Sequence, residues 1–566
     1  MRCVFSGFGG LVPRLAEHQL GAFGATLAHD VKLRNGILEP WMVNCHFADA
    51  VDGAQSFGLF GCCAVTWQDH VHVALMPPDW KRHYIACREG HGLEAIELAC
   101  ECRPSYYAGG VPAPLTPPTV AVTEECSREA DARSYVYTYV NKWGEESAPS
   151  PASNVVRVND GTTVIVSGLA DPPEGYGITH IFLYRASTGF RPADGKLQKF
   201  DTAYLFVAAL PVPVENDTFE DNIVGVHLGA ALETQDDRFP PYMSGVLSIK
   251  DQIRLVGWHK NRIYMSENLQ PYNWPARYDL TLDHTIIHMG ELNQRLFVTT
   301  DSIPYIIDVS SCDDTRCTPV TSIDTPLPDI GCNPVYGSVM TVHGLFYASP
   351  IGLILLQPNG EWIVVTAKWF GEEEWRKLHP DTIVMAYYEG YLMFATDKAT
   401  FLLDINGEPY DNPRGTELVT LSDKPAGLAT SNTGELILLQ DDELVVWSKG
   451  ATPREYIWRS RRITGGVDAT GPNDVSVSVR PQETRPIAGV SGPLWTPATV
   501  MLNGAGHIRL ETPHKRLALD RTVGAYEPVR CQRVGRHPWY IMTLTSRNTI
   551  ESVEIGTSVF TVHGGQ

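Results

Sequence analysis

The chain has 566 residues, with 65 acidic against 45 basic residues, a formal net charge of −20 and a hydrophobic content of 43%. This apolar content excludes a disordered or collagen-like chain, and the length suits about three domains. The acidic excess argues against a protein that wraps nucleic acid, because phosphate binding depends on Lys and Arg. Neither a secretory signal nor a run of ~20 apolar residues is recognisable, so we expect a soluble protein made in a reducing cytoplasm.

The first element expected in chain order is a helix over Pro13–Leu33, where apolar residues recur at spacings of three and four. Gly21 and Gly24 weaken it. Elsewhere, alternating and β-branched or aromatic runs are cut by Gly, Asn, Asp and Pro, which is typical of strands and hairpins. The sequence therefore predicts a mainly β fold.

Eight of the 12 cysteines fall in the first 126 residues, and none of the eight belongs to a C-x2-C pair of the kind that favours zinc. Four histidines lie nearby in the sequence and could complete a site: His70, His72, His83 and His91. Buried free thiols are the favoured interpretation. Cys312 and Cys317 bracket a polar loop, where two reduced thiols are favoured over a disulfide or a metal clip. We expect no metal and no cofactor.

Four prolines within Val111–Pro118 predict a stiff, extended boundary segment. Strand-length runs separated by turn residues follow it and indicate a small β-sandwich. The alternation in the first long run would place Tyr135, Tyr137 and Tyr139 on one face. The stretch Tyr135–Ser153, with the IFLYR run that follows, resembles a fibronectin type III-like module.

A hairpin pattern of apolar strand, short turn and apolar strand repeats along the middle of the chain. It occurs, most loosely in the first case, at Ile253–Ser266, Leu296–Val309, Leu345–Gln357, Tyr391–Asp404 and Leu436–Ser448. A hairpin repeated about every 45 residues is typical of β-propeller blades. A long two-sheet sandwich is the alternative. We expect a propeller of at least five blades, with a sixth that a segment from elsewhere in the chain could close.

The charge changes sign near the C-terminal end. Residues 451–566 contain 14 basic and nine acidic residues, a net charge of +5, whereas the preceding 450 residues carry −25. Thirteen of the 14 basic residues are arginines. Two groups stand out: Arg459, Arg461 and Arg462, and then Arg530, Arg533 and Arg536. They form either a solvated strand edge that prevents sheet pairing or a surface that contacts acidic partners or DNA phosphates.

These patterns divide the chain into four parts. They are an N-terminal part, 1–117, a fibronectin type III-like β-sandwich, 118–230, a β-propeller, 231–460, and a basic β-domain, 461–566. We expect the first and last parts to form one platform domain.

Signals for catalysis are weak. Four carboxylate groups were candidates for acid–base chemistry: Asp236–Asp237, Asp313–Asp314, Glu372–Glu374 and Asp441–Asp442. All lie in turns or polar runs, where solvated charge is the ordinary explanation. Nucleophile-elbow, P-loop, dinucleotide-binding, metalloprotease and EF-hand motifs are absent from the sequence. We therefore expect no catalytic residues and no enzyme activity.

Three stretches in a fixed order carry a family resemblance. The first, Phe5–Trp41, has a glycine-rich turn and an N-G-x-L-x-P ending at Asn35, Gly36, Leu38 and Pro40. The second is Tyr135–Gly189. The third, Arg262–Leu280, holds an S-E-x-x-x-P-x-x-W-P pattern at Ser266, Glu267, Pro271, Trp274 and Pro275. Together they resemble the tail nozzle (tail tubular protein B-like) proteins of short-tailed bacteriophages.

The resemblance implies a structural virion protein that assembles in the host bacterial cytoplasm as a homo-oligomeric ring of six copies. That ring would lie below the tail adaptor, bind tail fibre or needle proteins, and act as conduit and gate for the genome without inserting into a membrane. A channel for DNA should avoid phosphate binding, so its wall would be acidic or neutral, and the arginine groups would contact the adaptor or a neighbouring subunit. The alternative is a propeller lectin or glycan-degrading tail protein that recognises the host surface.

Overall fold

The computed structural model of the protein describes residues 2–5, 7–21, 23–33, 36–87, 92–98, 102–122, 131–159, 161–188, 203–214, 218–249, 252–309, 316–319, 331–332, 337–405, 417–464 and 494–556. Strands dominate these residues, and the only α-helix among them is the six-residue α1 (Glu372–Lys377). The predicted mainly β fold is confirmed. Within the described ranges, no helix is long and apolar enough to cross a membrane.

The chain forms two compact units. Unit 1 comprises Met1–Gly61, Ile287–Asp308 and Arg316–Gln566, and unit 2 comprises Cys62–Ile286 and Val309–Thr315. The division after Gly61 falls inside the predicted N-terminal part, 1–117, and the division after Ile286 falls inside the predicted propeller segment, 231–460.

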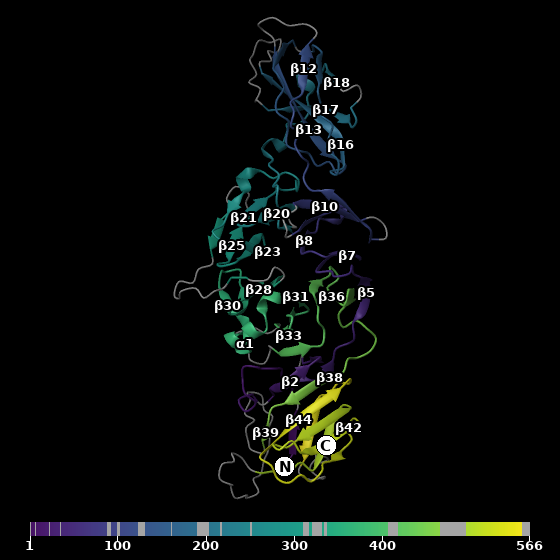
Figure 1. The fold of residues 1–566 in the computed structure, drawn as a ribbon, viewed down its shortest axis with the longest axis vertical. Helices are drawn as coiled ribbons and strands as arrows, with labels where there is room; N and C mark the ends of the chain where they lie inside the picture. Colours follow the sequence, from purple (N-terminus) through teal and green to yellow (C-terminus); the bar gives the residue numbers. More distant parts are fainter. Residues whose placement is uncertain are drawn as a thin grey trace. The chain divides into compact units, whose positions relative to one another are not determined.

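The middle of the unit 2 sequence forms a two-sheet β-sandwich, several of whose strands are labelled together in Figure 1. Its three-stranded sheet contains β12 (Thr119–Val122), β15 (Val164–Ser167) and β18 (Thr218–Asp221). Its four-stranded sheet contains β14 (Val156–Val158), β13 (Asp131–Asn141), β16 (Ile178–Thr188) and β17 (Leu205–Pro211). Tyr135, Tyr137 and Tyr139 share the sandwich core, whereas Val136 packs in a separate cluster. The predicted alternation of these tyrosines is therefore confirmed.

A buried ion pair lies inside this sandwich. Arg185 Nη1 donates to Asp221 Oδ2 at 2.8 Å, and both side chains are fully buried. The Tyr135 hydroxyl donates to the same oxygen at 2.7 Å, and the Ile223 amide donates to Asp221 Oδ1 at 2.9 Å. A buried guanidinium is tolerated only when it is paired, so Asp221 neutralises a charge that the sandwich cannot otherwise hold.

We expect Asp221→Ala to destabilise the sandwich by about 3–5 kcal/mol, because it leaves Arg185 buried and without its carboxylate. Calorimetric unfolding of the full chain would measure this. Glu174→Ala, which removes an exposed carboxylate of the same sandwich, is the control and should change stability by less than about 0.5 kcal/mol. Equal effects of the two substitutions would contradict the argument.

Unit 2 also contains two four-stranded antiparallel sheets. The first comprises β8 (Val71–Ala74), β9 (His83–Cys87), β10 (Leu93–Leu98) and β11 (Pro104–Ala108). The second comprises β19 (Gly245–Ile249), β20 (Arg254–His259), β21 (Arg262–Met265) and β22 (Leu280–Thr281). We call the first strand of each such sheet in chain order its leading strand. The leading strands β8 and β19 lie side by side and share one core with Trp274. Sequential antiparallel strands and adjacent leading strands are the arrangement of propeller blades.

Four sheets of the same kind follow in unit 1. The first comprises β23 (Ile286–Leu292), β24 (Arg295–Thr300), β25 (Tyr305–Asp308) and β26 (Arg316–Pro319). The second comprises β27 (Ser338–Thr341), β28 (Gly344–Ser349), β29 (Gly352–Leu356) and β30 (Trp362–Val364). The third set, which forms one end of a ten-stranded sheet, comprises β31 (Val384–Tyr388), β32 (Tyr391–Ala395), β33 (Thr400–Asp404) and β34 (Leu418–Leu421). The fourth comprises β35 (Gly427–Thr430), β36 (Leu436–Gln440), β37 (Glu443–Val446) and β5 (Cys45–Asp49).

All five predicted hairpins are present as antiparallel pairs, namely β20–β21, β24–β25, β28–β29, β32–β33 and β36–β37. The described residues thus contain six blade-type sheets. The β8–β11 sheet was not predicted, because the sandwich separates it from β19 and breaks the 45-residue spacing. β5, from the N-terminal segment, supplies the outer strand of the fourth sheet in unit 1, which contains the fifth predicted hairpin, whereas the predicted closure concerned a sixth blade.

The two ends of the chain fold together into a platform, which confirms that part of the predicted fold. β2 (Ala25–His29) pairs in parallel with β34 and antiparallel with β38 (Tyr456–Ser460). The same sheet continues through β44 (Trp539–Ser546), β41 (Gly506–Glu511) and β42 (Leu517–Val523), and β39 (Ile463–Thr464) also pairs with β44 (Figure 1). A second sheet orders β1 (Arg2–Phe5), β45 (Ser552–Gly556), β40 (Thr499–Asn503) and β43 (Val529–Arg530).

The predicted helix over Pro13–Leu33 is wrong. The described residues of this segment form turns and then β2. Two glycines, Gly21 and Gly24, oppose a helix, and the backbone of β2 gains hydrogen-bonding partners on both sides in the gap between β34 and β38. Tertiary pairing therefore overrides a weak local periodicity.

Candidate functional site

The first predicted arginine group lies along β38 and the residues after it. Arg459 Nη2 lies 3.5 Å from Glu511 Oε2, and Arg462 Nε lies 3.1 Å from Glu17 Oε2. The Arg462 guanidinium also lies over the Trp539 ring, 4.6 Å from its centroid. Arg461 donates its backbone amide to the Gly24 carbonyl at 3.3 Å. Arg462 thus links the N-terminal segment to the platform, and Arg459 links β38 to β41 within it.

The second predicted group differs because Arg530, Arg533 and Arg536 are exposed, on β43 and in the loop after it. A backbone hydrogen bond of 2.7 Å from Gln532 to Ala518 places this loop beside β42. The turn before β42 adds two exposed cations, Lys515 and Arg516, that the sequence analysis did not single out.

The five exposed cations on β43, its loop and the β41–β42 turn are called the basic face: Lys515, Arg516, Arg530, Arg533 and Arg536. His514 of the turn and His537 of the loop lie with ring centroids 6.0 Å apart, which joins the two segments. Within the described ranges, none of the five has an acidic partner at ion-pair distance. Exposed, unpaired guanidinium groups are suited to bidentate contact with carboxylates or phosphates.

A second cluster surrounds Arg454 at the junction of the propeller sheets and the platform. Arg454 binds the Asp423 carboxylate through both terminal nitrogens, with Nη1 2.6 Å from Oδ2 and Nη2 3.0 Å from Oδ1. Its Nε donates to the Met42 carbonyl at 2.9 Å, and Nη2 also donates to Asn44 Oδ1. Trp447 Nε1 donates to Asp423 Oδ2 at 3.1 Å.

This Arg454 cluster joins three distant parts of unit 1. Asn44 and Asp30 come from the N-terminal segment, Asp423 lies between β34 and β35, and Arg454 lies two residues before the start of β38. Asp30 Oδ1 accepts the Ser422 amide at 2.9 Å. A polar cavity of about 560 Å³ opens beside the cluster. The guanidinium of Arg454 already donates to Met42, Asp423 and Asn44. We therefore interpret the cluster as one that holds the three segments together.

The carboxylate of Glu417 links the N-terminal loop to the propeller sheets. The Gly10 amide donates to Glu417 Oε2, and the Leu11 amide donates to the Leu418 carbonyl at 2.8 Å. The pKa of Glu417 is raised to about 7, chiefly by burial and also by the nearby Asp404 carboxylate, whereas the Gly10 hydrogen bond and Lys368 lower it. A Cβ on Gly10 would come within 2.6 Å of the Leu418 carbonyl oxygen, so this close approach requires glycine.

In each described group of the carboxylates considered for catalysis, one member has a structural role. Asp237 accepts the Trp274 amide at 2.7 Å, and burial raises its pKa to about 7. Glu374 accepts the Gly371 amide at 2.9 Å and caps α1. Asp442 accepts the Gly53 amide at 3.1 Å. Asp313–Asp314 lies outside the described residues.

The S-E-x-x-x-P-x-x-W-P pattern forms a loop after β21. Ser266 Oγ accepts the Leu255 amide at 2.9 Å, and Glu267 accepts hydrogen bonds from Arg277 and from the Tyr278 hydroxyl. Trp274 is buried and packs edge-to-face on Phe239. Each of these side chains closes the loop on itself or on the adjacent sheet, so the pattern here specifies loop structure.

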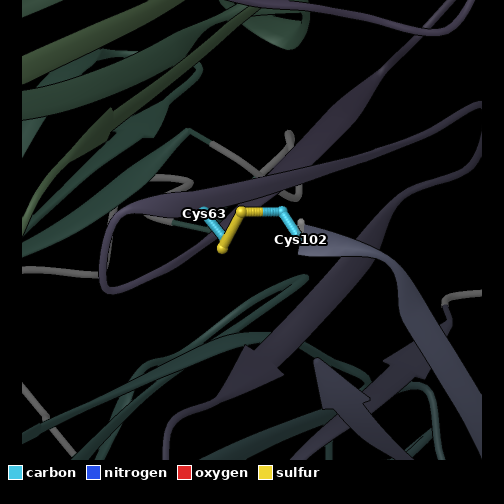
Figure 2. Close-up of a disulfide and its surroundings, with 2 residues drawn as sticks. All are labelled: Cys63 and Cys102. Carbon is cyan, nitrogen blue, oxygen red and sulfur yellow. A yellow bond between two sulfur atoms is a disulfide. The ribbon is translucent and has the colours of Figure 1, made fainter. Parts of the chain in front are cut away.

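The cysteines correct one expectation. Cys63, on β7 (Cys63–Trp67), forms a disulfide with Cys102, just before β11 (Figure 2). Cys45 and Cys62 are exposed, and Cys332 is buried. Buried free thiols were therefore the wrong interpretation for most of this region. No cluster of three or more His, Cys, Asp or Glu side chains that could hold a metal occurs among the residues described. Cys312 lies outside them.

No protein-family model and no curated protein matches the chain. Among solved structures, it is similar to the extracellular domain of a hybrid two-component system from B. thetaiotaomicron, at 10% identity and a TM-score of 0.29, covering 88% of this chain and 47% of that chain. It is also similar to BBS1N in complex with ARL6DN, at 9% identity, 72% and 96% coverage and a TM-score of 0.28. The WD40 β-propeller domain of Doa1 matches at 10% identity, 51% and 89% coverage and a TM-score of 0.25. Similarity at this level carries no functional information.

We expect Arg454→Ala to destabilise unit 1 by about 3–5 kcal/mol, because the buried Asp423 carboxylate loses its counter-charge. Arg547→Ala removes an exposed arginine that lines the same cavity and should cost less than about 0.5 kcal/mol. Denaturant unfolding of both variants would measure the difference. A small loss in Arg454→Ala would show that the cluster does not hold the three segments together.

The raised pKa of Glu417 predicts a pH dependence with a definite sign. Its ordinary pKa is 4.5, and the folded value is about 7. Protonation of Glu417 therefore stabilises the folded state, and this contribution is fully present below pH 4.5. The contribution, up to about 3 kcal/mol, is lost as the pH rises through 7. Glu417→Gln keeps the acceptor for Gly10 and should flatten this part of the profile. Unfolding midpoints measured from pH 5 to pH 8 would test it, and an unchanged slope in the variant would contradict it.

Proposed function

We propose that the protein is a structural component of the tail of a short-tailed bacteriophage, which assembles as a ring and forms the nozzle through which the genome leaves. The observation that carries the proposal is the basic face, five exposed and unpaired cations on the platform of a chain whose net charge is −20. Such a face needs an acidic partner, and the remainder of the chain, with its acidic excess, supplies one in a neighbouring copy. A face of one subunit that binds a different face of the next generates a closed ring when the rotation permits.

The acidic composition of the first 450 residues suits a conduit for DNA. Each Lys or Arg contact with phosphate adds affinity and retards passage, so we propose that the wall of the ring is acidic or neutral. The basic face then lies away from the DNA, against the adaptor or the next subunit. A cryo-EM map with arginines of the basic face along the lumen would overturn this assignment.

Negative-stain imaging and sedimentation velocity of the purified protein, alone and with the adaptor of the same phage, test the proposal directly. Rings with a central channel are expected. Monomers that bind or hydrolyse host surface polysaccharide would instead favour the propeller lectin or glycan-degrading protein.

Charge reversal of Arg530, Arg533 and Arg536 to Glu should weaken ring formation or adaptor binding at least tenfold, because it replaces attraction by repulsion at the contact. The matched control reverses three exposed cations elsewhere, Arg157, Lys377 and Lys449, and makes the same change in net charge. Sedimentation velocity and calorimetric titration would compare the two. Equal loss in both variants would place the effect in net charge and contradict a specific role for the basic face.

A further inference from the structure

A cavity of about 430 Å³ lies within unit 1, at the leading strands of its four blade-type sheets. β23, β27, β31 and β35 each contribute lining residues, and Gln55–Phe57 adds the start of β6 (Ser56–Phe60). Leading strands of successive blades are adjacent here, since β27 lies beside β31 and β31 beside β35. The cavity volume falls within the range of small-molecule sites.

The leading strands give this cavity hydrogen-bonding capacity from the backbone. In the sheet order of the described residues, each of the four is the terminal strand of its sheet. One edge of every such strand, with its N–H and C=O groups, is therefore left over from the ladder. A ligand placed between these strands meets backbone donors and acceptors from several directions.

The side chains of the lining are mostly apolar and all uncharged. The apolar surface comes from flexible and aromatic side chains, namely Met340, Met385, Leu428 and Phe57. Gly427 lets the Phe57 ring lie against β35, because a Cβ at this position would be 3.3 Å from that ring. His288 also lines the cavity, and burial lowers its pKa to about 4, so its imidazole is neutral at pH 7. A charged ligand would find no counter-charge among the lining residues.

One lining group is buried and has its hydrogen-bonding capacity unused. Ser338, the first residue of β27, is 9% exposed, and its Oγ has no hydrogen-bond partner among the described residues. A buried hydroxyl without a partner is unfavourable, and structures usually satisfy such a group with protein, water or a ligand. Thr430 differs, because its hydroxyl donates to the Tyr387 carbonyl at 2.5 Å.

We propose that this cavity is a binding site for an uncharged, largely apolar small molecule that carries a hydroxyl or carbonyl group, which pairs with Ser338 and with the free edges of the leading strands. Ordered water alone is the competing occupant. It would satisfy the same polar groups but would leave the methionine and aromatic surface unused. If the cavity is a site for an apolar ligand, an apolar probe with a hydroxyl group should bind in it, whereas a cavity that holds only ordered water should not bind the probe.

The probe is 2-naphthol, compared with naphthalene, which has the same ring system without the hydroxyl. Calorimetric titration of the full chain should give one saturable site with a dissociation constant on the order of 100 µM for 2-naphthol. Ala429→Trp fills the cavity and should weaken binding more than tenfold, whereas Ala367→Trp, an exposed position, should leave it unchanged. Absence of saturable binding, or equal binding in Ala429→Trp, would overturn the proposal.

A second variant keeps the test decisive if Ala429→Trp fails to fold. Ser338→Ala removes only the unpartnered hydroxyl, so it should unfold no more readily than the unmodified protein. Its preference for 2-naphthol over naphthalene should fall about fivefold, the effect of losing one hydrogen bond. An unchanged preference would show that Ser338 does not contact the ligand and would overturn the assignment of this site.

Discussion

The Arg454 side chain is only 10% exposed at the point where the propeller sheets of unit 1 meet the platform, so leaving its charge unpaired there would be unfavourable. Asp423 neutralises it through two hydrogen bonds, and both side chains also hold Asn44 of the N-terminal segment. The pairing of β2 with β34 and β38, and of β5 with β37, depends on the same N-terminal segment being in place. The ion pair thus fixes how three stretches of chain meet, and the platform sheet extends from that junction.

The parts of the fold that could be predicted from sequence are those whose partners are close along the chain. Hairpins such as β32–β33 join neighbouring strands, so alternation and turn residues suffice to locate them. The tyrosines of β13 reveal their buried face in the same way. β2 is different because its partners lie about 400 residues away, and its local pattern indicated a helix. Long-range pairing leaves no periodic signal, which is also why β5 could not be assigned to a sheet.

The candidate sites show the same limit. The sequence indicated two arginine groups with one role, whereas Arg459 and Arg462 pair with acids of the same chain and Arg530, Arg533 and Arg536 remain exposed. Which arginine is free depends on acids such as Glu17 that lie far away in sequence. Arg454 had no distinguishing pattern at all. Ser338 is equally unremarkable as a residue type, and only the meeting of four leading strands places it at a cavity.

The distant partners of β2 also determine when unit 1 can finish folding. A ribosome releases residues 25–29 long before it has made residues 456–460, and the Trp458 indole that donates to the Gly9 carbonyl is separated from it by 449 residues. Blade hairpins can form during synthesis, but the platform has to wait until its last strands appear. Because the basic face lies on that platform, chains still being translated would not present a completed contact surface. The contact that we propose for the basic face would then form only between finished molecules.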